Sequence, residues 1–167
     1  MFSKLIPDKY VENYQEITPY MIKSMGGRAV FVDLDGTLVS KNTKIPNEQV
    51  LEWIDKIIDA GIEFVLISNN TSRRVGEFAK DLEIHNIHSA RKPLHIGFRK
   101  AMNMIREDVL PSQIIMIGDQ IYTDTLAAKR FGAKSIYVSP IDTGSKYTRF
   151  RMNISEPYFV KKAKEKK

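Results

Sequence analysis

The stretch that decides the fold of this chain is AVFVDLDGTL, residues 29–38. Its first half is an apolar run rich in β-branched and aromatic residues, which is typical of a strand buried on both faces of a sheet. Its second half carries two carboxylates, Asp33 and Asp35, and the turn-forming Gly36 follows them directly. We therefore expect a buried parallel strand that ends in an acidic turn.

Further apolar runs of the same kind follow along the chain, with helical patterns between them. The runs lie at residues 62–68, 87–90, 114–117 and 135–139. The helical patterns begin at Asn47, at Thr71 or Ser72, ahead of Phe98 and ahead of Leu126. Strands that alternate with helices indicate an α/β fold with a central parallel sheet of about five strands, flanked by helices.

The length of 167 residues fits one compact domain. We divide it into an N-terminal helical arm at 1–27, a core at 28–140, and a C-terminal extension at 141–167 with a lysine-rich tail. The formal net charge of +6 is concentrated in that tail, because residues 161–167 hold five Lys and one Glu. The other 160 residues carry 21 basic and 19 acidic groups, so the body of the protein is almost neutral.

Composition excludes several classes of protein. The absence of cysteine rules out a disulfide framework, a thiolate metal site and a thiol nucleophile. We find no apolar run of the roughly 20 residues that a membrane span needs, and MFSKLIPDKY at 1–10 does not read as a signal peptide. We therefore expect a cytoplasmic protein. The near-neutral body lacks an aromatic and basic recognition motif, so we do not expect nucleic acid as a partner.

Carboxylates also follow a second strand of the predicted sheet. Asp119 ends the apolar run at 114–117, and Asp124 lies five residues further on. Asp33 and Asp35, two apart on an extended chain, face the same way and repel one another unless a cation lies between them. Carboxylates at one sheet edge predict a site for a hard cation, most plausibly Mg²⁺. The residues also allow plainer interpretations, in which Asp35 belongs to an ordinary turn and Asp124 opens a helix.

Two further positions follow the predicted strands. Ser68 and Asn69 begin a run of small hydroxyl and amide side chains that could bind an anionic group, or could simply cap the next helix. Lys92 precedes Pro93, which holds the lysine out of the helical region and so aims its side chain. The alternative for Lys92 is a solvated surface lysine. The three histidines are too few and too distant from the acidic residues to indicate zinc.

These residues, in this order, resemble the haloacid dehalogenase (HAD) superfamily of aspartate-nucleophile phosphotransferases. The first motif matches DLDGTL at 33–38 and the fourth matches Gly118-Asp119 through Asp124. Ser68 stands at the second motif and Lys92 at the third. The resemblance covers about residues 28–140 and implies a Rossmann-like core.

The chain as a whole is similar to the YqeG group of class IIIA HAD phosphatases, which is similar in turn to the fungal mitochondrial phosphatidylglycerophosphatases. That likeness rests on KLIPDKY at 4–10, ITP at 17–19, GDQ at 118–120 and Thr123-Asp124. Gly36 stands where Asn is common in this group, and both residues suit a tight turn.

The resemblance implies a Mg²⁺-dependent phosphate monoester hydrolase. In that chemistry Asp33 attacks phosphorus and forms an aspartyl-phosphate, while Asp35 serves as general acid and then as general base. Ser68, Asn69 and Lys92 bind the phosphoryl group, and Lys92 also stabilises the charge that redistributes during transfer.

The resemblance further implies how the metal is held. Asp33 and Asp119 are expected to ligate Mg²⁺ through their carboxylates, and Asp35 through its main-chain carbonyl. Asp124 would support the metal shell or Lys92.

The spacing of the motifs leaves no room for a cap domain. Asp33 and Ser68 are 35 residues apart, and Ser68 and Lys92 are 24 apart, enough in each case for little more than one helix and one strand. An open site favours a phosphate displayed on something large, with the headgroup of phosphatidylglycerophosphate as the leading substrate. A soluble nucleotide or sugar phosphate, or a phosphate-binding module without turnover, are the alternatives.

The two ends of the chain suggest where such a substrate would be met. Aromatic, aliphatic and lysine side chains at 1–25 and the lysine tail could contact an anionic membrane at its inner face. In the alternative, the arm packs on the sheet and the tail is solvated.

Overall fold

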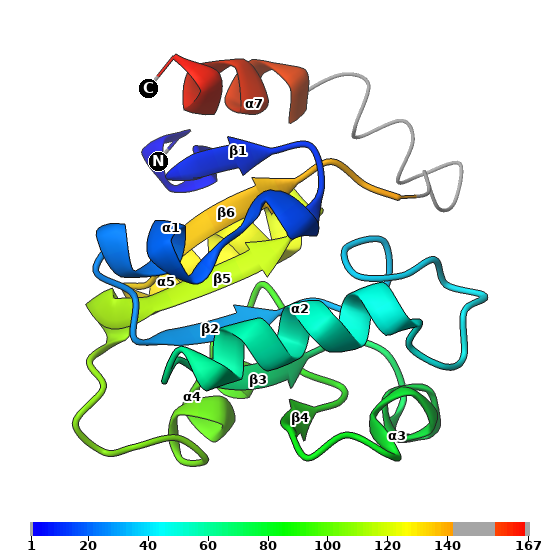
Figure 1. Cartoon of the computed structure of the whole chain (residues 1–167). Coiled ribbons are helices and arrows are strands. Elements are labelled where there is room, and N and C mark those ends of the chain that lie inside the picture. The colour runs from blue at the N-terminus through cyan, green and yellow to red at the C-terminus, as the bar shows by residue number, and fades with distance from the viewer. Residues whose placement is uncertain (1, 142–155, 166–167) are drawn as a thin grey trace.

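Six parallel strands form the central sheet of the structure, a computed structural model that describes residues 2–141 and 156–165. The strands are β1 (Lys9–Val11), β2 (Ala29–Val32), β3 (Glu63–Ile67), β4 (His85–Ile87), β5 (Ile114–Gly118) and β6 (Lys134–Val138). Their order across the sheet is β1-β6-β5-β2-β3-β4, and every neighbouring pair is parallel (Figure 1). The predicted Rossmann-like α/β fold is therefore confirmed.

Helices cover both faces of the sheet (Figure 1). The helices are α1 (Pro19–Ser24), α2 (Glu48–Asp59), α3 (Ser72–Ala79), α4 (Ile96–Met102), α5 (Leu126–Phe131) and α7 (Glu156–Lys164). Shorter helical turns lie at Phe2–Leu5, Tyr14–Glu16, Pro111–Gln113 and Ile121–Thr125. α1, α2 and α3 pack on one face, and α4 and α5 pack on the other, so the core has two layers.

The central strand β2 shows why these residues form this sheet. All four of its side chains are fully buried, because β3 and β5 pair with its two edges and helices cover its two faces. Val30 and Val32 point into one layer of the core, while Ala29 and Phe31 point into the other. Burial on both faces explains the continuous apolar run, which lacks the alternation of a half-exposed strand.

The predicted helix starts are also present. The Asn47 side chain accepts a hydrogen bond from the Val50 N–H at 3.0 Å and caps α2. Thr71 caps α3 in the same way, through the Arg74 N–H. These caps satisfy amide groups that have no partner within the helix, so each helix begins at a defined residue close to the end of a loop.

The N-terminal arm, expected as a helical segment, contains α1 and two short helical turns and also a strand that its sequence did not indicate. Residues 9–11 form β1, which pairs in parallel with β6 and supplies the sixth strand of the sheet. Asp8 anchors this strand, because its Oδ2 accepts hydrogen bonds from the Ser135 N–H at 2.7 Å and from Lys129 Nζ at 2.5 Å. The Trp53 indole also donates to the Ile17 carbonyl at 2.8 Å. The strand is short and half-polar, so its sequence carries no strand pattern and only the free edge of β6 explains it.

The C-terminal extension is described in part. α7 lies beside β1 (Figure 1), and Phe159 joins Ile121 and Tyr137 in a small apolar cluster. Residues 142–155 and 166–167, which include the end of the predicted lysine-rich tail, lie outside the described residues. Within the part of the chain that the structure describes, no helix is long and apolar enough to span a membrane.

Replacing Asp8 with alanine tests whether the arm contributes to the stability of the core. Asp8→Ala should lower the free energy of unfolding by about 1–3 kcal/mol, because the Ser135 N–H and the Lys129 ammonium lose their common acceptor. Urea unfolding followed by circular dichroism measures the change. Asp55→Ala, at an exposed position on α2, is the control and should change stability by less than about 0.5 kcal/mol. Equal effects of the two substitutions would show that the arm adds nothing to the stability of the core.

Candidate active site

The predicted site residues gather at the carboxyl edge of the sheet. Asp33 follows β2, Ser68 follows β3, Lys92 lies in the loop after β4, and Asp119 follows β5. Because these strands are parallel, their carboxyl ends lie side by side, and ligands of open α/β sheets bind at this edge. All four residues are buried. The topology therefore brings together positions that are up to 86 residues apart in the chain.

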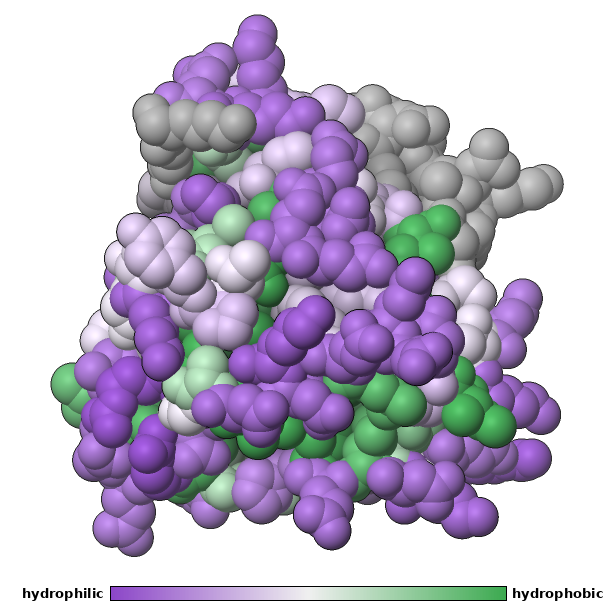
Figure 2. All heavy atoms as spheres, in the orientation of Figure 1, coloured by the Kyte–Doolittle hydropathy of each residue, from purple (hydrophilic) through white to green (hydrophobic). Residues whose placement is uncertain are grey.

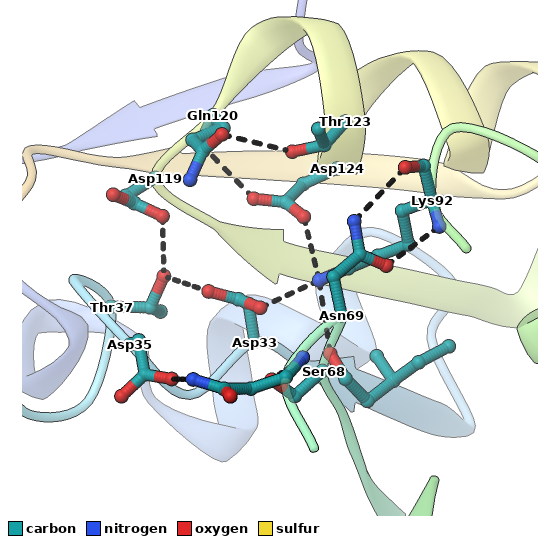
Figure 3. Close-up of polar contacts among 12 residues, drawn as sticks. Asp33, Asp35, Thr37, Ser68, Asn69, Lys92, Asp119, Gln120, Thr123 and Asp124 are labelled. Atoms are coloured by element: carbon teal, nitrogen blue, oxygen red, sulfur yellow. Dashed lines mark hydrogen bonds and ion pairs between the residues drawn. The ribbon is translucent and has the colours of Figure 1, made fainter. Parts of the chain in front are cut away.

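The ammonium group of Lys92 lies at the centre of the cluster (Figure 3). Its Nζ is 2.6 Å from Asp33 Oδ1 and 2.8 Å from Asp124 Oδ1, and it donates to the Ile67 carbonyl at 2.9 Å. Only 2% of the Lys92 side chain is exposed, which excludes a solvated surface lysine. Burial lowers the pKa of Lys92, but the charges of Asp124 and Asp33 more than offset that effect, so its pKa is raised and the group stays protonated.

A threonine of the first motif links two of the carboxylates. Thr37 Oγ1 lies 3.2 Å from Asp119 Oδ1 and 3.4 Å from Asp33 Oδ2. The single hydroxyl proton can serve one of them at a time. Gly36 makes this approach possible, because a Cβ at that position would lie 2.4 Å from Asp119 Oδ2, and its φ of 91° is a left-handed conformation.

Three buried carboxylates are close enough to hold a metal ion. Asp33, Asp119 and Asp124 each offer an oxygen, and these oxygens lie within 4.8 Å of one another. Burial raises the pKa of Asp33 to about 6 despite the opposing charge of Lys92. Burial, with Asp33 and Asp124 as negative neighbours, also raises the pKa of Asp119 well above its usual value. The site therefore has an excess of buried negative charge, and its oxygen donors suit a hard divalent cation.

Asp124 and Asp35 have different places from the other acids. Asp124 accepts a hydrogen bond from the Gln120 N–H at 3.1 Å while it pairs with Lys92, so it supports the start of the helical turn Ile121–Thr125 and also belongs to the cluster. The side chain of Asp35 is not among the three carboxylates that could hold a metal. A contribution of Asp35 through its main-chain carbonyl stays a prediction.

The Asp35 carboxylate is bound by Arg74, which the sequence pattern did not indicate, and by Asn70, which belongs to the run of hydroxyl and amide side chains after β3. Arg74 Nη2 lies 2.8 Å and Nε 3.1 Å from Asp35 Oδ1, so the guanidinium approaches with two donors. The Asn70 side chain donates to Asp35 Oδ2 at 2.9 Å. Arg74 lies in the first turn of α3, and its position directly after a strand-end loop was the only local sign of a role.

The loop residues after β3 organise the position of Lys92. Asn69 makes two hydrogen bonds with the Lys92 main chain, one to its carbonyl at 3.0 Å and one from its N–H at 2.7 Å. Ser68 Oγ accepts from the Asn70 N–H at 3.1 Å. Ser89 and Arg91, just ahead of Lys92, both have left-handed backbone angles. Strained backbone of this kind persists only where the surroundings hold it in place, which here includes the pair of bonds from Asn69.

These side chains line an open cavity of about 290 Å³. The lining residues are polar or charged, and they are Asp33, Asp35, Lys41, Ser68, Asn69, Asn70, Lys92, Gln120 and Thr123. Of these, Lys41 did not stand out in the sequence, and Gln120 and Thr123 stood out only in the likeness to a family. Between residues 36 and 92, all of which the structure describes, the chain forms a loop, two helices and two strands, with no additional domain. The prediction of a site without a cap is thus consistent with the structure.

The fold and the site together define a class of protein. A doubly wound parallel sheet with an acidic cluster and a buried lysine at its carboxyl edge is the arrangement of a HAD-type hydrolase. In agreement, a family model described as HAD-hydrolase-like matches residues 89–149. Two solved structures share the fold: an uncharacterised protein from Listeria monocytogenes serotype 4b (15% identity, TM-score 0.54, 71% of this chain and 83% of that chain) and a hypothetical protein from Xanthomonas campestris (16%, 0.53, 84% and 79%).

A sequence relative identifies the family more closely. The chain is 34% identical over 153 residues to the probable phosphatase YqeG of Bacillus subtilis (strain 168), which covers 89% of this chain and 86% of the relative. The chain therefore belongs to the same family of the HAD superfamily as that protein, and it is a HAD-type phosphatase.

The raised pKa of Asp33 predicts how stability depends on pH in the metal-free protein. A carboxyl group whose pKa rises from 3.8 to about 6 on folding contributes stability that is complete below the lower value and is lost as pH rises through the higher one. In EDTA, the free energy of unfolding of Asp33→Asn, relative to that of the unmodified protein, should therefore increase as the pH rises from about 4 to about 7. Urea unfolding of both proteins at each pH measures this difference. A constant difference, or one of opposite sign, would show that burial of Asp33 does not have this effect.

Proposed function

We propose that this phosphatase hydrolyses phosphate monoesters with the help of Mg²⁺ and through an aspartyl-phosphate on Asp33. The observation that carries the proposal is the position of Asp33. Its side chain lines the polar cavity and also lies beside a buried lysine, Lys92, and two buried carboxylates, Asp119 and Asp124. A carboxylate held between a cation and an open cavity is suited to nucleophilic attack on an anionic substrate.

Two residues of the first motif divide the chemistry. An oxygen of Asp33 forms a bond to phosphorus while the bond from phosphorus to the ester oxygen breaks, and the electron pair of that bond goes to the leaving oxygen. Asp35 gives this oxygen a proton, and in the second step it takes a proton from the water that attacks phosphorus and releases Asp33. Both residues line the same cavity, which supports this division.

The other cavity residues support binding of the phosphoryl group. Ser68, Asn69 and Lys92 line the same cavity as Asp33 and Asp35, and the ammonium of Lys92 supplies positive charge at the nucleophile. Charge placed in a buried site before reaction is worth more than the same charge in water. We propose that Lys92 and Ser68 contact the transferring phosphoryl oxygens, while Asn69 also holds the Lys92 main chain in place.

The acidic cluster supports a bound Mg²⁺. Asp33, Asp119 and Asp124 would hold the ion, whose charge allows an anionic nucleophile to approach an anionic phosphate. The raised pKa values of Asp33 and Asp119 are what these carboxylates would show without such a cation.

We further propose that the substrate phosphate is displayed on a large molecule, with the headgroup of a phospholipid such as phosphatidylglycerophosphate as the leading case. An open cavity without a cap supports access for a bulky substrate. α7 begins next to the turn that follows β5, because the Glu156 side chain accepts a hydrogen bond from the Ile121 N–H. Lys161 and Lys162 on this helix are exposed, and Figure 2 shows hydrophilic side chains over α7 at the top of the molecule. Exposed lysines on α7 would attract the anionic inner face of a membrane.

Hydrolysis of p-nitrophenyl phosphate tests the chemistry. The unmodified protein should release p-nitrophenol in Mg²⁺ and lose that activity in EDTA. Asp33→Asn should lower turnover by at least about three orders of magnitude, because it removes the nucleophile. Asp55→Asn, with the same change at an exposed position on α2, should keep full activity. Full activity of Asp33→Asn would overturn the assignment of the nucleophile, and phosphate binding without any turnover would indicate a binding module.

A substrate panel tests the proposed substrate class. The kcat/KM for phosphatidylglycerophosphate in mixed micelles should exceed that for glycerol phosphate and nucleoside monophosphates by at least about tenfold. The protein should also sediment with anionic vesicles, and the double variant Lys161→Glu with Lys162→Glu should bind them less than the control variant Lys56→Glu with Lys100→Glu. A preference for a soluble phosphate would favour the alternative substrate class, and absence of vesicle binding would argue against a membrane substrate.

A further inference from the structure

We infer that Arg74, assisted by Asn70, is a positioning residue for Asp35 that leaves a single carboxylate oxygen, Oδ2, to exchange the proton. This inference rests on the proposed function, because it concerns the residue that gives and takes the proton in that reaction. The two nitrogens of the Arg74 side chain that approach Asp35 Oδ1 lie at 2.8 and 3.1 Å.

The surroundings of the Arg74 guanidinium indicate a role beyond surface charge pairing. Its side chain is 12% exposed and that of Asp35 is 10% exposed, so the pair is largely withdrawn from water. The third guanidinium nitrogen, Nη1, is buried and has no hydrogen-bond partner among the residues that the structure describes. The guanidinium carbon also lies 5.8 Å from the centre of the Phe78 ring. Burying such a group at a cost to its own hydrogen bonding is a weak way to gain stability.

The neighbouring Arg73 shows the contrast. Arg73 pairs with Glu77 one turn along α3, and 86% of its side chain is exposed. Its ion pair is of the kind that contributes little to stability. Two arginines in succession on one helix thus have different partners, and only Arg74 contacts a residue of the first motif.

Asn70 completes the support of Asp35 from the other side. Its side-chain nitrogen donates to Asp35 Oδ2 at 2.9 Å, and its side-chain oxygen accepts from the Thr71 N–H at 2.8 Å. The second bond decides which end of the amide faces Asp35, because only the oxygen can accept from an N–H. The donor group of Asn70 therefore points at the carboxylate.

Counting lone pairs assigns the reacting oxygen. Each carboxylate oxygen offers about two acceptor positions. Oδ1 of Asp35 uses both on Arg74, whereas Oδ2 uses one on Asn70 and keeps one. The remaining position on Oδ2 carries the proton, which passes to the ester oxygen as that oxygen takes the electron pair of its bond to phosphorus. The same position receives the proton of the attacking water in the second step.

The experiment compares two leaving groups in a single turnover with enzyme in excess and Mg²⁺ present. Proton donation matters for the poor alkoxide leaving group of glycerol phosphate and matters little for p-nitrophenolate. Arg74→Gln should slow release of glycerol by about 10- to 100-fold, and release of p-nitrophenol by less than about threefold. Arg73→Gln removes the same charge from the same helix and should change neither rate.

A double-mutant cycle with Asp35→Asn shows whether Arg74 acts through Asp35. In the Asp35→Asn background, Arg74→Gln should cause no further loss of glycerol release, because the group that it positions is already inactive. Arg74→Lys keeps the charge and loses the two-pronged geometry, so it should fall between Arg74→Gln and the unmodified enzyme. It replaces Arg74→Gln in the cycle if circular dichroism shows that Arg74→Gln does not fold.

The outcomes separate this inference from the proposed function. If the unmodified enzyme turns over neither ester, the proposed function fails and this inference fails with it. If the unmodified enzyme is active but Arg74→Gln or its lysine substitute slows both leaving groups equally, or adds its full effect to that of Asp35→Asn, then the inference alone is overturned. A merely structural role for Arg74 predicts that last result.

Discussion

The ammonium group of Lys92 lies between two carboxylates that reach it from different parts of the fold, Asp33 after β2 and Asp124 in the turn after β5. All three groups are buried, and removing Lys92 would leave two carboxylates away from water without the cation that pairs with them. The loops around the site hold Lys92 in the position that this contact requires. Asn69 holds the main chain of Lys92 by two hydrogen bonds, and the strand-end carbonyl of Ile67 takes the third donor of its ammonium. The position of the acidic cluster in this phosphatase thus depends on one lysine.

Two glycines allow the carboxylates to come so close. A Cβ at Gly36 would lie 2.4 Å from Asp119 Oδ2, and a Cβ at Gly118 would lie 2.3 Å from Asp124 Oδ2. Neither position can therefore carry a side chain without moving an acid of the cluster. Gly36 lies in the turn that follows β2. The sequence therefore indicates it as a turn residue, and the structure shows that its missing side chain also leaves space for Asp119.

Asp33 and Asp35 are two residues apart and have different surroundings. Asp33 lies with a buried ammonium and two other carboxylates, whereas Asp35 accepts hydrogen bonds from Arg74 and Asn70. Different surroundings are how two carboxyl groups in one site take different roles. The sequence predicted that both aspartates belong to the site, because alternation along a strand places them on one side. It could not predict their partners, because Arg74 is 39 residues from Asp35 and its helix position alone is ordinary.

The sequence by itself determined the α/β class, the helix cap at Asn47, a helix start at Thr71 or Ser72, and the strand-end positions of the site residues, because apolar periodicity and capping act over a few neighbouring residues. Only the tertiary structure decided that Lys92 is buried with Asp33, 59 residues away, and that Asn69 makes hydrogen bonds with the Lys92 main chain. It also decided that Lys9–Val11 forms a sixth strand, since three half-polar residues become a strand only when the edge of β6 offers them hydrogen bonds. Each of these segments could pair with many others, and its partner is decided by contacts between distant parts of the chain, which a local sequence pattern does not predict.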